Sequence, residues 1–177
     1  VQNNIEEQTA LMDDLGMSGV LVMGLVSAAL FIFFKAFKAT SALLFSLICG
    51  TFWTFGLSYF LVGYLNANSA FLGSIIIGNG INFGVIYLAR YLEERRAGRN
   101  HVRSTYLAMM RSSGATLTAA LAAGFSYGSL VFTSFRGFKQ FGVIGLVGMV
   151  FCWTSAYTIL PATLTLIEKW RPLYRDR

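Results

Sequence analysis

The strongest constraint on the fold of this chain is a set of four long segments that contain no Asp, Glu, Lys or Arg. The longest covers residues 39–89, and the others cover 15–34, 112–135 and 141–167. Charged residues make up only 12% of the sequence, against about 25% in an ordinary soluble domain. A fold exposed to water does not tolerate uncharged segments of this length, so the sequence indicates a membrane protein.

Five membrane-spanning helices fit into these segments. A helix that crosses the ~30 Å hydrocarbon core of a bilayer needs about 20 apolar residues. The longest segment must hold two helices, and Asn66, Asn68 and Ser69 favour a turn between them. The predicted fold is all-α, a polytopic membrane bundle with transmembrane helices at about 17–34, 41–64, 71–92, 113–135 and 141–167.

The basic residues predict the orientation, because short connections rich in Lys and Arg stay on the cytoplasmic side. Lys35 and Lys38 follow the first helix, six arginines lie between residues 90 and 111, and four basic residues follow the fifth helix. The opposite side receives only Arg136 and Lys139 among the connections. We therefore expect a multi-pass protein of the inner (plasma) membrane with its N-terminus outside and its C-terminus in the cytoplasm.

The ends of the sequence are expected to lie outside the bilayer. Residues 1–16 are acidic and polar and predict the end of an external, periplasmic segment, while residues 169–177 predict a basic cytoplasmic tail. The transmembrane domain is predicted over residues 17–168. The sequence does not start with Met and lacks the basic start and apolar core of a signal peptide, so we expect a piece of a longer chain.

The connection between the third and fourth helices is too long for a turn. Its second half, residues 100–111, has helical periodicity and predicts an amphipathic helix on the cytoplasmic surface. A solvated basic loop that only fixes the orientation is the alternative. The expected contacts to lipid head groups are Arg95, Arg96, Arg99 and Arg103.

The third predicted helix carries the most unusual polar residues. Ser74, Gly78, Asn79 and Asn82 fall within an arc of about 140° at the helical spacing of 100° per residue. An amide in hydrocarbon is costly without a partner, so this face should contact protein or a wet cavity. Two interpretations stay open: the amides line a transport pathway, or they only hold helices together, which contributes about 0.6 to 2 kcal/mol per bond.

Small residues at regular spacing predict close helix packing. They let neighbouring backbones approach each other. The third helix has such a pair, the fourth helix repeats them every four residues, and the fifth repeats glycine every three. The predicted packing positions are Gly80, Gly84, Ala120, Gly124, Gly128, Gly142, Gly145 and Gly148.

Several classes of chemistry lack the residues that they need. No carboxylate lies between Asp14 and Glu93 or between Glu94 and Glu168, so these segments cannot carry a proton relay based on carboxylates. Cys49, Cys152 and the single histidine, His101, have no spacing that suggests a disulfide framework or a metal site. We expect no enzymatic activity, cofactor, metal or nucleic-acid partner.

The order of the motifs resembles a known family. The stretch Gly-Asn-Gly-Ile-Asn-Phe-Gly runs into Ala-Arg-Tyr-Leu-Glu-Glu-Arg-Arg-Ala-Gly, and Phe-Arg-Gly-Phe-Lys-Gln-Phe-Gly (135–142) and Ile-Leu-Pro-Ala (159–162) follow. Together they resemble the RND superfamily, and within it the MMPL-type exporters of lipids and hydrophobic molecules, including the hopanoid-transporter branch. The resemblance covers about residues 13–168.

This resemblance implies that the chain holds the last five helices of one six-helix repeat. The implied partners are membrane lipids, the second repeat of the same polypeptide and an external porter domain, and a homo-oligomer stays open. It also places Asn82 where related proteins carry a proton-relay Asp, and Phe83 at the aromatic position that follows. The Ser74, Gly78, Asn79, Asn82 and Phe83 face is thus the hypothetical coupling face, without a titratable group.

Two other functions stay open beside export of a hydrophobic cargo. The glycine-rich helix with its charged Arg/Glu cap also resembles the membrane part of the SecD and SecF protein-export subunits. Five consecutive helices also resemble a sterol-sensing domain, which reports on lipid without moving it. We rank the exporter first, the export accessory second and the sensor third.

Overall fold

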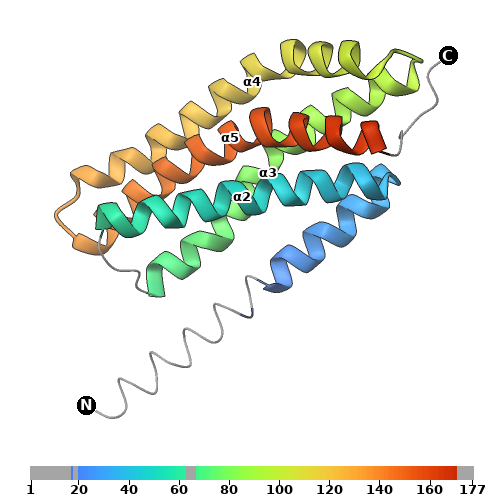
Figure 1. The fold of residues 1–177 in the computed structure, drawn as a ribbon. Helices are drawn as coiled ribbons and strands as arrows, with labels where there is room; N and C mark the ends of the chain where they lie inside the picture. The colour runs from blue at the N-terminus through green and yellow to red at the C-terminus, as the bar shows by residue number, and fades with distance from the viewer. Residues whose placement is uncertain (1–16, 18–19, 63–66, 171–177) are drawn as a thin grey trace.

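The computed structural model describes residues 17, 20–62 and 67–170, and all long elements in this part of the chain are α-helices (Figure 1). It contains a first helix, Val20–Phe34, followed by α2 (Phe37–Val62), α3 (Ala67–Arg96), α4 (His101–Ser129) and α5 (Arg136–Trp170). A short 3-10 helix, η1 (Leu130–Phe132), continues the end of α4. The predicted all-α membrane bundle with five apolar helices is confirmed.

Four of these helices, α2 to α5, are long and apolar enough to cross a membrane, and the first helix is shorter but also apolar. The chain is a multi-pass membrane protein. Consecutive helices run in opposite directions, so the connections at 35–36 and 97–100 and the end of α5 lie together at one end of the bundle (Figure 1). We call this the Trp170 end.

α3 and α5 extend beyond the predicted limits at both ends, whereas α2 ends at Val62 instead of residue 64 and α4 ends at Ser129 instead of residue 135. α3 begins at Ala67 instead of residue 71 and ends at Arg96 instead of residue 92, and α5 covers 136–170 instead of 141–167. A helix continues past the hydrocarbon core because its backbone hydrogen bonds do not depend on apolar side chains. Asn68 and Ser69, expected in a turn, therefore belong to α3. Asn66 of the predicted turn, the predicted external segment and most of the predicted basic tail lie outside the described residues, which omit 1–16, 18–19, 63–66 and 171–177.

The surface helix expected at residues 100–111 is not a separate element. α4 runs without interruption from His101 to Ser129, and the side chain of Asn100 caps it by accepting the backbone N–H of Arg103 at 2.9 Å. Ser112 does not break the helix, because its hydroxyl donates to the carbonyl of Ala108 at 2.6 Å. One buried stripe crosses the expected boundary: Ser104, Ala108, Ser112, Thr116, Ala120 and Gly124.

α5 occupies the centre of the bundle and packs against α2, α3 and α4. Its polar side chains find partners on these helices. Ser155 pairs with Ser46 of α2, whose hydroxyl donates to the Ser155 carbonyl at 2.9 Å. The Tyr157 hydroxyl lies 2.7 Å from the Thr116 hydroxyl and donates to the Ser112 hydroxyl at 2.8 Å. These hydroxyl groups thus tie α5 to α2 and α4.

Candidate functional site

The polar face predicted on α3 lies on the side of this helix that the neighbouring helices leave uncovered. Asn79 and Asn82 are exposed, and Ser74 and Gly78 are half-buried. A Cβ atom added at Gly78 would meet no atom within 4 Å. The opposite side of α3 packs into the core through Ile76, Tyr87 and Leu88, which are fully buried. The bundle therefore presents two exposed amides in the uncharged part of α3.

The two amides differ in their contacts. Asn79 Nδ2 donates to the hydroxyl of Tyr127 on α4 at 3.2 Å. The Asn82 side chain makes no hydrogen bond with the part of the chain that the structure describes. Asn79 thus joins two helices, whereas the Asn82 amide is turned away from the bundle.

Phe83 does not belong to this face. It is 5% exposed and packs in the hydrophobic core. Neighbouring positions on a helix point about 100° apart, so Phe83 and Asn82 face different surroundings. The structure brings together Ser74, Gly78, Asn79 and Asn82 and separates Phe83 from them, which corrects the predicted coupling face.

The small residues on α3 and α5 lie at close contacts between helices. A Cβ atom at Gly80 would lie 2.6 Å from Cys152 Sγ, and one at Gly84 would collide with Leu43 of α2. A Cβ atom at Gly148 would lie 2.8 Å from Ile76 of α3 and 3.2 Å from Thr54 of α2. α2 and α3 therefore approach α5, and α2 approaches α3, through positions where a larger side chain does not fit.

The contact between α4 and α5 is closest near η1. A Cβ atom at Gly142 would lie 2.6 Å from the carbonyl oxygen of Tyr127, and one at Gly145 would lie 2.6 Å from the Tyr127 ring. A Cβ atom at Gly128 would lie 2.9 Å from the end of the Leu146 side chain. Gly124 is more open, with its nearest atom at 4.0 Å, and Ala120 beside it is buried.

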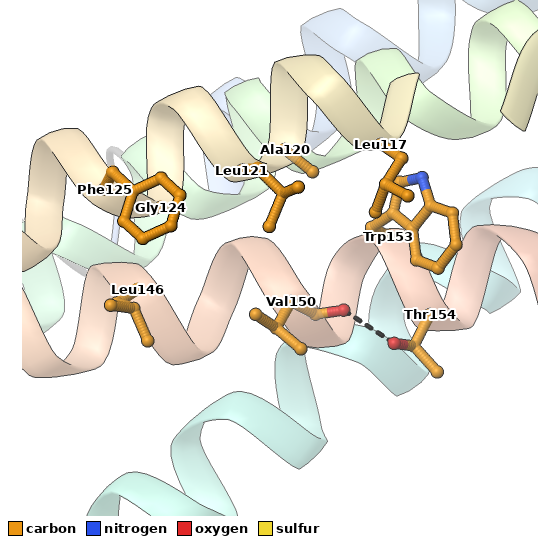
Figure 2. Close-up of a pocket in the computed structure, with 9 residues that line it drawn as sticks. All are labelled: Leu117, Ala120, Leu121, Gly124, Phe125, Leu146, Val150, Trp153 and Thr154. Atoms are coloured by element: carbon orange, nitrogen blue, oxygen red, sulfur yellow. Dashed lines mark hydrogen bonds between the residues drawn. The ribbon is translucent and has the colours of Figure 1, made fainter. Parts of the chain in front are cut away.

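A groove opens between α4 and α5 beside these contacts (Figure 2). Its volume is about 270 Å³. The polar atoms near it are occupied: Trp153 Nε1 donates to the Thr116 hydroxyl at 3.2 Å, and the Thr154 hydroxyl donates to the Val150 carbonyl at 2.8 Å (Figure 2). The groove is therefore apolar. Its lining residues are Leu117, Ala120, Leu121, Gly124, Phe125, Leu146, Val150, Trp153 and Thr154.

A polar cluster at the Trp170 end joins α3, α4 and α5, and the sequence did not predict it. Arg95 Nε lies 3.1 Å from Glu168 Oε1, and these side chains are 2% and 6% exposed. The Tyr91 hydroxyl donates to the same carboxylate oxygen at 3.0 Å and lies 2.9 Å from His101 Nδ1. The sequence did contain a signal for this cluster, because acidic and basic residues both occur where three predicted helices end on the predicted cytoplasmic side.

The cluster changes the interpretation of the arginines expected at lipid head groups. Arg95 is buried and paired with Glu168, so it does not reach the surface. Arg99 is partly exposed and pairs with Glu94, which also pairs with Arg111. Arg96 and Arg103 are exposed. Within the described ranges, no group of three His, Cys, Asp or Glu side chains is placed to hold a metal ion.

Comparison with known proteins gives relatives that are membrane proteins. The chain is 28% identical to the hopanoid transporter HpnN of Burkholderia multivorans over 91% of its length, and 26% identical to HpnN of Rhodopseudomonas palustris over 92%. It is 25% identical over 93% of its length to a membrane protein of Methanocaldococcus jannaschii, of which it covers 41%. The chain spans only 18% and 19% of the two HpnN proteins. The sequence model of the MMPL family matches residues 4–177, and the chain therefore belongs to the MMPL family.

Proposed function

We propose that this chain is a membrane-spanning part of a transporter that exports lipids or other hydrophobic molecules across the bacterial inner membrane. Membership of the MMPL family and the similarity to two proteins named as hopanoid transporters support this function. They favour export over the SecD/SecF-like accessory role and the sterol-sensing role.

The observation that carries the proposal is the uncovered amide face of α3. Asn82 is exposed on a helix that is long and apolar enough to cross the membrane. An amide without a hydrogen-bond partner is costly in hydrocarbon. We infer that a second repeat of the same polypeptide, or a wet cavity between the two repeats, covers this face in the complete transporter.

Movement at this face would be coupled to an external porter domain that handles the cargo. Asn82 keeps the shape and hydrogen bonding of an Asp but does not titrate in the physiological range. No carboxylate lies between Asp14 and Glu93 or between Glu94 and Glu168. A proton-driven transporter of this kind would therefore use a carboxylate of the other repeat.

The proposed orientation places the Trp170 end in the cytoplasm. Lys35, Lys38, Arg96 and Lys169 lie at this end, whereas Arg136 and Lys139 lie at the other. The excess of basic residues at the Trp170 end supports this assignment. Cysteine accessibility at Lys139 and Lys169 in intact cells tests it, because only the Lys139→Cys variant should react with a reagent that does not cross the membrane.

An Asp introduced at position 82 tests the proposal in the full-length protein. Asn82→Asp should insert normally if protein or water covers the face, and should give transport a new pH dependence. The matched control is Thr118→Asp, because Thr118 is also an exposed polar residue within a long apolar helix. A charge that faces lipid costs about 2.5 to 3.5 kcal/mol of insertion free energy, so Thr118→Asp should insert poorly. Equally poor insertion of both variants would contradict the proposal.

Removal of each amide separates a transport role from a packing role. Asn79→Ala removes the hydrogen bond to Tyr127 and should lower stability, with transport per folded molecule retained. Asn82→Ala removes no bond within the described bundle and should lower transport per folded molecule with little change in the stability of this half. Wild-type transport by folded Asn82→Ala protein would show that this amide is not part of the pathway.

A further inference from the structure

His101 is the first residue of α4, and both nitrogens of its ring lie within hydrogen-bond distance of a hydroxyl group. Nδ1 lies 2.9 Å from the Tyr91 hydroxyl of α3, and Nε2 lies 2.9 Å from the Thr165 hydroxyl of α5. His101 is the single histidine of the sequence. The imidazole therefore bridges the two helices that flank the start of α4.

Both hydroxyl protons are directed to other acceptors. The Tyr91 hydroxyl donates to Glu168 Oε1 at 3.0 Å, and the Thr165 hydroxyl donates to the Pro161 carbonyl at 2.8 Å. A hydroxyl group has one proton to donate and can accept with its lone pairs. When both of these bonds are made, each hydroxyl can only accept from the histidine, and each ring nitrogen must donate.

Only a protonated imidazole donates from both nitrogens. A neutral ring has one nitrogen without a proton, and that nitrogen requires the proton of Tyr91 or of Thr165. Either the bond from Tyr91 to Glu168 or the bond from Thr165 to Pro161 is then lost. With Glu168 as the carboxylate that pairs with Arg95, the four hydrogen bonds coexist only when His101 is charged.

We propose that His101, Tyr91, Glu168 and Thr165 form a proton-binding site that joins the ends of α3, α4 and α5. Loss of the proton breaks one of the four bonds and weakens this junction. The site is separate from the Asn82 face and does not depend on the proposed transport function. Histidine is the side chain whose charge ordinarily changes between pH 5 and 8, and the bonds that only the protonated ring makes hold its proton to higher pH, so the junction weakens as the pH rises above that range.

The charges around the ring have opposing effects on the stability of its protonated form. Nδ1 and the Glu168 carboxylate bond to the same Tyr91 oxygen, at 2.9 and 3.0 Å, and an opposite charge at this range favours the protonated ring. The start of a helix disfavours a cation. The protonated ring is favoured overall because only this form allows all four hydrogen bonds of the site. The other charged groups on the surrounding elements are Glu94 and Arg95 of α3, Arg99 of the connection, Arg103 and Arg111 of α4, and Lys169 of α5.

Nitrogen NMR of the full-length protein, labelled at histidine and held in lipid nanodiscs, tests the proposal directly. The signals of His101 are those that disappear in His101→Gln. At pH 7.5, where an exposed histidine is mostly neutral, both ring nitrogens of His101 should carry a proton. A ring nitrogen without a proton at this pH would overturn the proposal.

Three variants distinguish this site from a general effect of the surroundings. Glu168→Gln removes the carboxylate charge and should weaken proton binding by His101 about tenfold, and Thr165→Val, which removes the acceptor for Nε2, should also weaken it. The control Lys169→Gln should leave proton binding within twofold, because Lys169 is exposed. If Glu168→Gln does not fold, Thr165→Val decides. Unchanged proton binding in both folded variants would overturn the proposal.

Discussion

The contact between Gly142 and the end of α4 gives a sharp prediction about packing. A methyl group at position 142 would lie 2.6 Å from the carbonyl oxygen of Tyr127 and 3.1 Å from the backbone nitrogen of Val131, whereas ordinary contact begins at 3.4 Å. Because both atoms belong to the backbone, no side-chain rotation relieves the collision. Gly142→Ala therefore requires α4 and η1 to move away from α5.

The expected magnitude combines two opposing effects. Excess volume in a packed core typically costs 1 to 3 kcal/mol, and collision with backbone places Gly142→Ala at the upper end of about 3 kcal/mol. Alanine favours a helix over glycine by about 1 kcal/mol. The net loss in the free energy of unfolding is about 2 kcal/mol. Gly124→Ala is the matched control, because its nearest atom would be Met149 Cβ at 4.0 Å, and it should gain up to about 1 kcal/mol.

Unfolding in mixed micelles, with the denaturing detergent fraction raised in steps, measures this difference on the full-length protein. The two variants should differ by about 3 kcal/mol in unfolding free energy, with Gly142→Ala the less stable. Equal stability would refute the packing argument, because both substitutions add the same methyl group to a helical glycine.

The same unfolding measurement checks two further predictions. Arg95→Ala leaves the Glu168 carboxylate buried without this ion pair and should cost about 3 to 5 kcal/mol. Arg90→Ala removes the ion pair with Glu93, in which the two side chains are 52% and 63% exposed, and should cost less than about 1 kcal/mol. Similar costs for the two variants would refute the distinction between a buried and an exposed ion pair. Tyr157→Phe removes the hydroxyl that bonds to Thr116 and Ser112 and should cost about 1 to 2 kcal/mol, while Tyr106→Phe, at a residue that is 60% exposed, should cost nothing measurable.

The number and kind of helices could be predicted because the absence of charge is a strong signal over 20 or more residues. The residues at which the helices begin and end could not be predicted in the same way. Arg96 and Trp170 lie in helices that continue into the polar region, where apolar side chains are no longer required. The surface helix predicted at 100–111 and the span predicted at 113–135 form one helix, because no residue between them interrupts the backbone hydrogen bonds of α4.

The candidate face on α3 was predictable from helical spacing alone, and the structure leaves Asn79 and Asn82 exposed on one side of that helix. The expectation that protein or a wet cavity covers this face stays a prediction. Phe83 was assigned to this face through the family resemblance and not through its angle on the helix. Its burial shows that a motif of adjacent residues does not describe one surface of a helix.

The polar cluster could not be predicted from spacing, because its partners are far apart in the sequence. Glu168 meets Arg95 and Tyr91, which lie 73 and 77 residues away. Charges near the ends of apolar helices suggested lipid head groups, and for exposed residues such as Arg103 this stays a prediction. Arg95 instead pairs with the Glu168 carboxylate of the neighbouring helix α5.

The central position of α5 has a consequence for how the protein is made. This helix follows its partners α2, α3 and α4 in the sequence, and it packs against all three. During synthesis these partners enter the bilayer before the helix that supplies Ser155 to Ser46 and Tyr157 to Thr116. Until α5 inserts, the hydroxyl groups and glycine surfaces of α2, α3 and α4 that contact it in the native bundle lack these partners. Substitutions that delay the insertion of α5 should accordingly lengthen the period in which the membrane's quality-control proteases can recognise the nascent chain.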